Sequence, residues 1–254
     1  MPPLEGRSAL ITGGSRGLGR SVAACLATNG ADIGIVGRDV AGLEHTKALV
    51  TDAGRECFAI EADLATVDGA RAAGEAALAH SDRWDILVNN AGIAVSASLL
   101  DVDVETWDRT MAVNLRAALL MAQAVVPGML ERRTGKIINV SSVGAFLATP
   151  NLGAYAASKA ALNQLTRAMA HEWGPSNVQA NAVCPTIILT DMGHEVWDDP
   201  SRVGEREEKL ARIPLRRFGE PEDVAEAVAF LASSAADFIN GVSLPLDGGL
   251  LIVP

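Results

Sequence analysis

The sequence predicts an α/β protein, a single domain over residues 1–254 with a doubly wound, mostly parallel sheet of seven strands and helices on both faces. Three observations predict it. Short apolar runs alternate along the chain with longer helical patterns. A length of 254 residues suits one large domain. The 24 glycines and the low aromatic content, 4%, favour tight strand–helix turns over a β-sandwich built on aromatic pairs.

Seven apolar runs bounded by glycine or proline are expected to be the strands, buried on both faces. They cover residues 8–12, 31–37, 57–62, 84–92, 135–142, 178–185 and 242–249. Helical patterns lie between them, and the clearest are residues 17–29, 103–130 and 154–174. Gly30 follows the first of these at a position where helices commonly end. Strand, helix and strand in succession imply right-handed crossovers in one sheet.

Residues 186–218 break this alternation. The segment is highly charged from Asp198 to Arg212 but carries apolar residues at Met192, Val196 and Trp197. A plain surface connection would not need these apolar side chains. We therefore expect a short helical lid over the edge of the sheet where the strands end.

Charge and composition narrow the choice of partners. The net charge of −10 argues against nucleic acid and anionic membranes. The three cysteines are far apart and the four histidines lack metal-ligand spacing, so neither a disulfide framework nor a metal site is expected. The N-terminal residues lack a signal segment and their apolar run is too short to span a membrane. We expect a cytoplasmic protein.

A glycine-rich turn, TGGSRGLG at residues 12–19, follows the first strand and opens the first helix. Glycines allow the backbone to turn sharply and to approach a pyrophosphate. The helix N-terminus then offers free N–H donors to the phosphates. A glycine cluster alone is weak evidence, but its place in this strand–turn–helix context predicts a dinucleotide-binding, Rossmann-type domain.

The end of the second strand indicates which dinucleotide is bound. An acidic residue about 20 positions after the glycines would accept the ribose hydroxyls of NAD. Here the sequence reads Val36-Gly37-Arg38, and Arg16 adds a second cation. Arginine suits the 2′-phosphate of NADP. We therefore predict NADP(H) in preference to NAD(H), which remains possible, although Arg38 alone would also suit a solvated loop.

Polar residues also end the third and fourth strands. Asp63, followed by Leu64, could accept a hydrogen bond from the adenine amino group or simply cap the next helix. The motif Asn89-Asn90-Ala91-Gly92 needs hydrogen-bond partners. A bound ribose and the neighbouring strands would supply them.

The only tyrosine of the chain, Tyr155, lies one helical turn before Lys159, so both project from one helix face. A nearby ammonium favours phenolate, and a pKa nearer neutrality suits acid–base catalysis. For an isolated pair, simple packing would explain both residues better.

Ser142 ends a strand where α/β sheets bind ligands, and its hydroxyl could hold a substrate oxygen. Asn114, among apolar neighbours, is either a surface residue or buried with a specific partner.

Taken together, these motifs resemble the short-chain dehydrogenase/reductase family over essentially the whole chain, ending with Asp-Gly-Gly at 247–249. The resemblance implies Tyr155 as general acid/base, Ser142 orienting the carbonyl, Lys159 holding the nicotinamide ribose and lowering the tyrosine pKa, and Asn114 anchoring a relay water. It also implies a homotetramer and no metal. The cofactor-binding residues would be Gly13, Ser15, Arg16, Gly17, Leu18, Gly19, Arg38, Asp63, Leu64, Asn90, Ala91, Gly92, Tyr155, Lys159, Pro185, Thr186, Ile188 and Thr190.

Within that family the chain is similar to the dicarbonyl/L-xylulose reductase and gluconate 5-dehydrogenase branches. It departs from the xylulose reductases at Leu152, where their pattern has a histidine. The expected substrate is therefore a small sugar, polyol or dicarbonyl, contacted by Ser142, Val143, Leu152, Tyr155, Met192 and Trp197. Two alternatives stay open, a 3-oxoacyl-(acyl-carrier-protein) reductase docking through Arg132-Arg133 or Arg216-Arg217, and a nucleotide-sensing protein without turnover.

Overall fold

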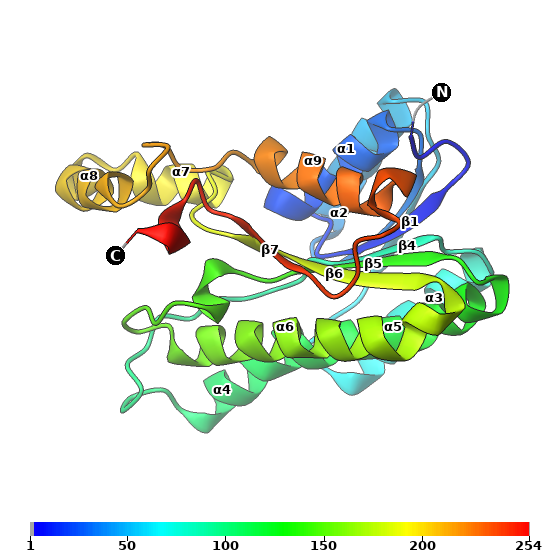
Figure 1. Ribbon diagram of the computed structural model, residues 1–254, viewed down its shortest axis with the longest axis horizontal. Helices are drawn as coiled ribbons and strands as arrows, with labels where there is room; N and C mark the ends of the chain where they lie inside the picture. The colour runs from blue at the N-terminus through cyan, green and yellow to red at the C-terminus, as the bar shows by residue number, and fades with distance from the viewer. Residues whose placement is uncertain (1–2, 254) are drawn as a thin grey trace.

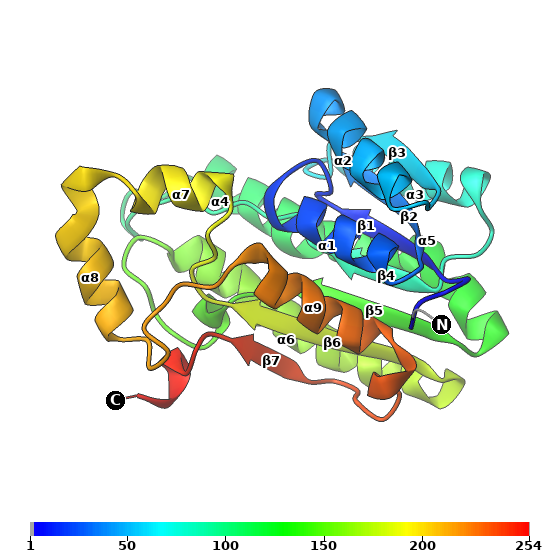
Figure 2. The same ribbon diagram turned by 90° about the horizontal axis from the view of Figure 1, so that it is seen from above.

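The computed structural model describes residues 3–253, apart from the side chains of Asp191 and Met192. Its centre is a seven-stranded sheet in the order β3-β2-β1-β4-β5-β6-β7, and every neighbouring pair is parallel (Figures 1 and 2). The sheet is thus wholly rather than mostly parallel in the described residues. The strands are β1 (Ser8–Thr12), β2 (Asp32–Gly37), β3 (Cys57–Glu61), β4 (Ile86–Asn89), β5 (Gly135–Val140), β6 (Val178–Pro185) and β7 (Ser243–Leu246).

Helices cover both faces of this sheet, as the alternation in the sequence predicts (Figure 1). On one face lie α1 (Gly17–Thr28), α2 (Val40–Asp52) and α9 (Pro221–Ala232). On the other lie α3 (Val67–His80), α4 (Val104–Met111), α5 (Ala117–Arg132) and α6 (Gly153–Trp173). Successive strand residues supply the two cores: in β1, Ala9 and Ile11 pack with α1 and α9, whereas Leu10 packs with α3 and α5.

The predicted long helix at 103–130 is one continuous helical run from Val104 to Arg132, but it is not uniform. A five-residue π-helical turn, Ala112–Arg116, separates α4 from α5. The run is long and apolar enough to cross a membrane. However, α5 buries Met121, Val125 and Met129 against the sheet, which is typical of a core helix in a globular protein. The π turn contains Asn114, and such turns are frequent at functional sites.

Five strands are shorter than the apolar runs predict, and two of them by four or more residues. The run at 84–92 forms a strand only over Ile86–Asn89. Trp84 does not extend the start of this strand, because its side chain packs in the core on the side of α3 and α5 and its Nε1 donates to Ala77 O at 3.1 Å. The run at 242–249 narrows to Ser243–Leu246. Its chain turns away where the Asp247 carboxylate accepts from Gly249 N and Leu251 N at 2.9 and 2.8 Å.

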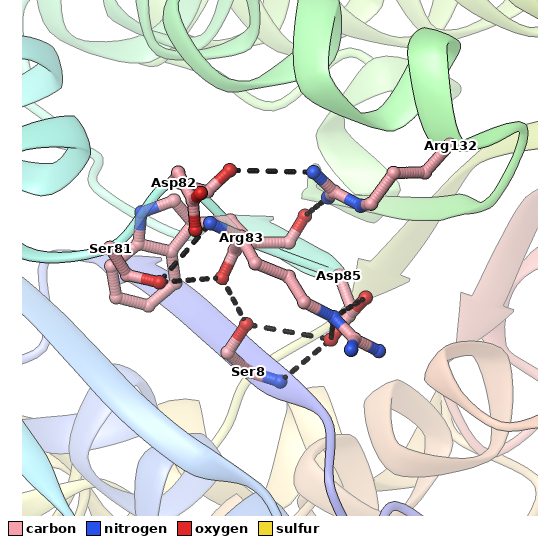
Figure 3. A network of polar contacts seen from close by, with 7 residues as sticks. Ser8, Ser81, Asp82, Arg83, Asp85 and Arg132 are labelled. Carbon is pink, nitrogen blue, oxygen red and sulfur yellow. Dashed lines mark hydrogen bonds and ion pairs between the residues drawn. The ribbon is translucent and has the colours of Figure 1, made fainter.

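A polar network closes the edge of the sheet where the strands begin (Figure 3). Asp85 is fully buried and accepts from Ser8 N at 3.1 Å and from Arg83 Nε at 3.1 Å. Arg132 reaches over from the end of α5 and donates to Trp84 O at 3.0 Å. The network ties the starts of β1 and β4 to α5, on the side of the sheet away from the strand ends.

The segment at 186–218 forms a helical insertion, as predicted. It contains α7 (Asp191–Trp197), a short 3₁₀ turn (Pro200–Arg202) and α8 (Val203–Ala211). In Figures 1 and 2 these helices project beyond the left end of the sheet, where the strands end. Leu189 N donates to Gly219 O at 2.8 Å, which holds the two ends of the insertion together.

Candidate active site

A cavity of about 610 Å³ lies where the strands end. It collects predicted site residues from four elements that are far apart in sequence: the glycine turn, the end of β4, α6 and the end of β6. The predicted residues in its wall are Arg16, Leu18, Asn90, Gly92, Tyr155, Lys159, Pro185, Thr186 and Ile188. The wall also contains residues that the sequence did not single out, namely Ile93, Ala94, Val95, Thr106, Arg109, Val140 and Ser141.

The glycine turn has the geometry of a phosphate cradle. Gly13 and Gly17 have φ of +68° and +52°, a left-handed conformation that favours glycine. The turn is held from behind, since Thr46 Oγ1 donates to Gly14 O at 2.8 Å and Arg20 Nη2 to Ser15 O at 2.7 Å. Among the described residues no side chain caps α1, and its first turn has no acid. The α1 N–H donors therefore remain available at the cavity, so these residues fit a dinucleotide phosphate.

The motif at the end of β4 joins this turn to the rest of the site. Asn90 Nδ2 donates to Thr12 O at 3.0 Å and to Gly13 O at 3.1 Å, and Ala91 N donates to Thr12 Oγ1 at 3.1 Å. A side chain at Gly92 would come within 3.4 Å of Lys159 Nζ. Asn90 thus fixes the glycine turn, and Gly92 leaves open the space in front of the lysine.

Tyr155 and Lys159 project from α6 into the cavity wall as the spacing predicts, with Lys159 Nζ 5.8 Å from the centroid of the tyrosine ring. Lys159 is 3% exposed, and its Nζ donates to Val140 O at 2.7 Å. Ser142 follows β5, and its Oγ accepts from Gly144 N at 3.0 Å. A side chain at Gly144 would meet both Ser142 Oγ, at 3.4 Å, and the Tyr155 ring, at 3.5 Å. Serine and tyrosine therefore flank the same glycine.

The electrostatics of the pair differ from the sequence expectation. Burial raises the pKa of Tyr155 above its ordinary value, while the hydrogen bond with Ser142 lowers it and Cys184 adds a small increase. Burial also lowers the pKa of Lys159 to about 8. We expected the lysine to bring the tyrosine pKa down; instead, loss of hydration outweighs the hydrogen bond with Ser142 at Tyr155 and the charge of Cys184 at Lys159. At neutral pH the phenol keeps its proton.

Asn114 is buried, at 1% exposed, which resolves the alternative left open by the sequence. Its Oδ1 accepts from Ile93 N at 2.8 Å, and its Nδ2 donates to Ile93 O and to Ser158 Oγ, both at 2.9 Å. Ser158 Oγ in turn donates to Tyr155 O at 2.7 Å. The side chain of Asn114 therefore ties the cavity wall at Ile93 to the helix that carries Tyr155.

Ser158 is a residue that reasoning from the sequence missed. It is fully buried between Asn114 and the backbone of Tyr155. The available signal was its spacing, because a residue three positions after Tyr155 lies on the same helix face. Nothing in the sequence indicated that its partner would be 44 residues away.

Several predicted residues lie outside the cavity wall. Arg38 is exposed after β2, and Asp63 accepts from Ala65 N at 3.0 Å in a local turn, while Leu64 is buried in the core. Thr190 caps α7 and lies against Gly17. Their roles toward the cofactor, like those of Gly13, Ser15, Gly17, Gly19 and Ala91 around the turn, stay predictions.

The residues predicted on the substrate side have mixed positions. Val143 and Leu152 are half-buried near Ser142 and at the start of α6, and the side chain of Met192 lies outside the described residues. Trp197 is absent from the cavity wall. Its ring packs on Phe218, with ring centroids 5.2 Å apart, and the Arg202 guanidinium carbon lies 5.4 Å from its centroid. Both partners belong to the insertion itself, Phe218 being its last residue. A contact between Trp197 and substrate stays a prediction.

The basic residues considered for carrier-protein docking do not gather at the cavity. Arg132 belongs to the network at the opposite edge of the sheet, and Arg133 Nη2 donates to Pro175 O at 2.8 Å. Arg217 pairs with Asp223 through two hydrogen bonds, of 2.5 and 2.8 Å, which lower the pKa of that carboxyl. Nothing in this arrangement favours an acidic carrier protein.

Comparison with known proteins agrees with this fold. A family model described as enoyl-(acyl carrier protein) reductase matches residues 13–251. The chain is 40% identical to D-threitol dehydrogenase of Mycolicibacterium smegmatis, covering 98% of this chain and 94% of the relative. It is 39% identical to human L-xylulose reductase, covering 97% of each chain.

A solved structure of a gluconate 5-dehydrogenase from Burkholderia cenocepacia, in complex with NADP and tartrate, superposes with a TM-score of 0.91. Its sequence is 37% identical, and the match covers 99% of this chain and 97% of that one. The fold and site define a nicotinamide-dependent oxidoreductase. The chain belongs to the short-chain dehydrogenase/reductase family, whose members use NAD(P) to interconvert alcohols and carbonyls.

Proposed function

We propose that the protein is an NADP(H)-dependent oxidoreductase that interconverts a carbonyl and a secondary alcohol on a small sugar, polyol or dicarbonyl. One observation carries this proposal: the phosphate cradle, Tyr155 and Lys159 open onto a single cavity. The relatives named for threitol, xylulose and gluconate support a small polyhydroxylated substrate, which includes both neutral and acidic sugars.

The protein's own groups supply the proton side of the reaction. In reduction, Tyr155 donates its proton to the carbonyl oxygen, which Ser142 holds by a hydrogen bond. The raised pKa of Tyr155 supports this role, since the phenol is protonated at neutral pH. The bound nicotinamide would supply the hydride for the carbonyl carbon. The product is then a secondary alcohol, and solvent returns the proton to Tyr155.

The remaining residues position these groups. Lys159 lies beside Tyr155 and across from Gly92, where it can hold the nicotinamide ribose. Arg16 is exposed at the glycine turn and lines the cavity, and Arg38 is exposed at the end of the adjacent β2. These two arginines support a 2′-phosphate and hence NADP(H), and the acid that follows Arg38, Asp39, caps α2 by accepting from Gly42 N at 3.1 Å.

The test is a nicotinamide-oxidation screen over ketoses, diketones and a 3-oxoacyl thioester, with NADPH and with NADH. We expect turnover of a ketose or diketone with the higher kcat/KM for NADPH. Tyr155→Phe should lower kcat by about 10²- to 10⁴-fold, because the general acid is lost, with the melting temperature retained. A variant that keeps most of its activity would refute the mechanism, and a clear preference for NADH would refute the cofactor assignment.

A further inference from the structure

The charge of the cavity wall opposes the charge of the whole protein. The chain carries a net charge of −10, yet the described residues in the wall of the cavity include Arg16, Arg109 and Lys159 and no aspartate or glutamate. Arg16 belongs to the phosphate cradle and Lys159 to the catalytic pair. Arg109 has no part in the proposed reaction.

Arg109 comes from the layer of the molecule that carries Tyr155, not from the layer that carries the glycine turn. It lies on α4, which packs against α6 on one face of the sheet, whereas α1 lies on the opposite face (Figure 1). Thr106, one turn earlier on α4, lines the same cavity. The adjoining wall at Ile93 is fixed by three hydrogen bonds of Asn114, two of them to Ile93 itself. Arg109 therefore borders the catalytic side of the cavity on a firmly held wall.

The guanidinium of Arg109 makes no hydrogen bond or ion pair with the residues that the structure describes, which do not include the side chains of Asp191 and Met192. Glu105 lies four residues earlier on the same helix, the spacing that favours a Glu–Arg pair. The pair is not formed, and Arg109 lines the cavity instead. An arginine that faces a cavity with all its donors available is suited to bind an oxyanion in two-pronged geometry.

We propose that Arg109, together with the Thr106 hydroxyl, binds an anionic group of the substrate, so that the preferred substrate is a sugar acid with a carboxylate rather than a neutral ketose or polyol. This rests on the proposed function and narrows its substrate class. The cofactor phosphates already have the free N–H groups of α1 and Arg16 on the other side of the cavity. The anion nearest to Arg109 is therefore expected to belong to the substrate.

A matched pair of ketones tests the proposal. 5-Keto-D-gluconate and L-sorbose share the same ketone and secondary hydroxyls and differ in a terminal carboxylate against a hydroxymethyl group. We expect the wild-type protein to have the higher kcat/KM for the keto acid. Arg109→Gln should raise KM for the keto acid about 10- to 100-fold, the loss expected for a charge-assisted hydrogen bond, with KM for L-sorbose and for NADPH unchanged.

Arg109→Lys should retain part of the effect, since it keeps the charge and loses the planar fork. Added salt should raise KM for the keto acid in the wild-type protein and not in Arg109→Gln. Arg71→Gln is the matched control, because Arg71 is an exposed arginine on α3 away from the cavity wall. Arg109 is itself exposed, so its replacement should leave the melting temperature unchanged.

Other outcomes overturn the proposal in distinguishable ways. A rise of KM for NADPH alone would assign Arg109 to the cofactor. Equal effects on both sugars, or none, would remove its role in substrate choice. Turnover of L-sorbose but not of the keto acid would support the proposed function and overturn the anion site. If neither ketone is reduced, binding is measured instead as the rise in melting temperature caused by D-gluconate or D-glucitol in the presence of NADP⁺. The proposal is overturned if D-gluconate gives no rise that depends on Arg109.

Discussion

Two buried lysines lie at opposite ends of the sheet, and their surroundings differ. Lys136 on β5 is 4% exposed, near the edge where the strands begin, and its Nζ lies 2.7 Å from Asp237 Oδ1. Lys159 on α6 is 3% exposed, at the edge where the strands end, and its Nζ donates to Val140 O, also at 2.7 Å. Within the described residues, no carboxylate pairs with Lys159.

The difference separates a buried lysine with a compensating charge from one without. A buried ammonium costs free energy unless an opposite charge compensates it, and Lys136 has that compensation. Lys159 lacks it, so burial lowers its pKa to about 8. A strongly shifted pKa at a cavity, beside the only tyrosine, is what the catalytic role proposed for Lys159 predicts.

The largest expected effect is a loss of kcat when Lys159, but not Lys136, is replaced with methionine. Lys159→Met should lower kcat at least about 100-fold, because it removes the cation beside Tyr155. Its free energy of unfolding should not fall, since an uncompensated buried amine is removed. Lys136→Met should leave kcat unchanged. Steady-state kinetics and denaturant melts measure both, and equal kinetic losses in the two variants would erase the distinction.

A second expected effect is a pH dependence that belongs to Lys159 alone. Its proton is lost as the pH rises through about 8, so the rate of carbonyl reduction should decline above that pH. Lys159→Arg keeps the cation and should lack this decline.

The lowered pKa of Lys159 also predicts how the free energy of unfolding changes with pH. In the unfolded chain the lysine keeps its proton up to its ordinary pKa of 10.5, whereas in the folded protein it keeps it only up to about 8. Stability relative to Lys159→Met should therefore rise between pH 8 and 10.

Agreement between the profiles of wild type and Lys159→Arg would show that another group controls the rate. Lys136→Met serves as the control in these profiles. It removes an equally buried amine and should leave the decline above pH 8 in place.

The smallest effect concerns the polar network around Asp85 (Figure 3). Asp85→Asn weakens the acceptor for Ser8 N and Arg83 Nε and should lower the free energy of unfolding by about 1–3 kcal/mol. kcat should not change, because the network lies at the edge away from the cavity. Asp82→Asn is the matched control, since Asp82 contributes its backbone carbonyl to Arg132 rather than its carboxylate. A kinetic loss in Asp85→Asn would show that the two edges are coupled.

Local signals sufficed for much of the site. The glycine turn, the Asn89–Gly92 motif and the Tyr155–Lys159 spacing each follow from short-range backbone or helix geometry, and the structure gathers representatives of each at one cavity. The strand ends were less predictable. Trp84 lies outside β4 because its ring N–H donates to Ala77 O, and Asp247 lies outside β7 because its carboxylate accepts from Gly249 N. The hydrophobic pattern of the sequence does not predict either contact.

Other features required the folded chain. The spacing of Tyr155 and Lys159 was correct, but the direction of the tyrosine pKa depended on burial by distant elements. Asn114 could be a surface or a buried residue until its hydrogen bonds to Ile93 and Ser158 were known. Trp197 met the pattern of a lid residue, yet its ring packs on Phe218.

The sequence by itself determined the alternation of strands and helices, the glycine turn and the placing of Tyr155 and Lys159 on one helix face, because each depends on residues close together along the chain. Only the tertiary structure decided which of two buried lysines keeps a carboxylate partner and that Arg109 faces the cavity. Both depend on solvent exclusion and on side chains from separate layers, which meet only when the helices pack on the sheet.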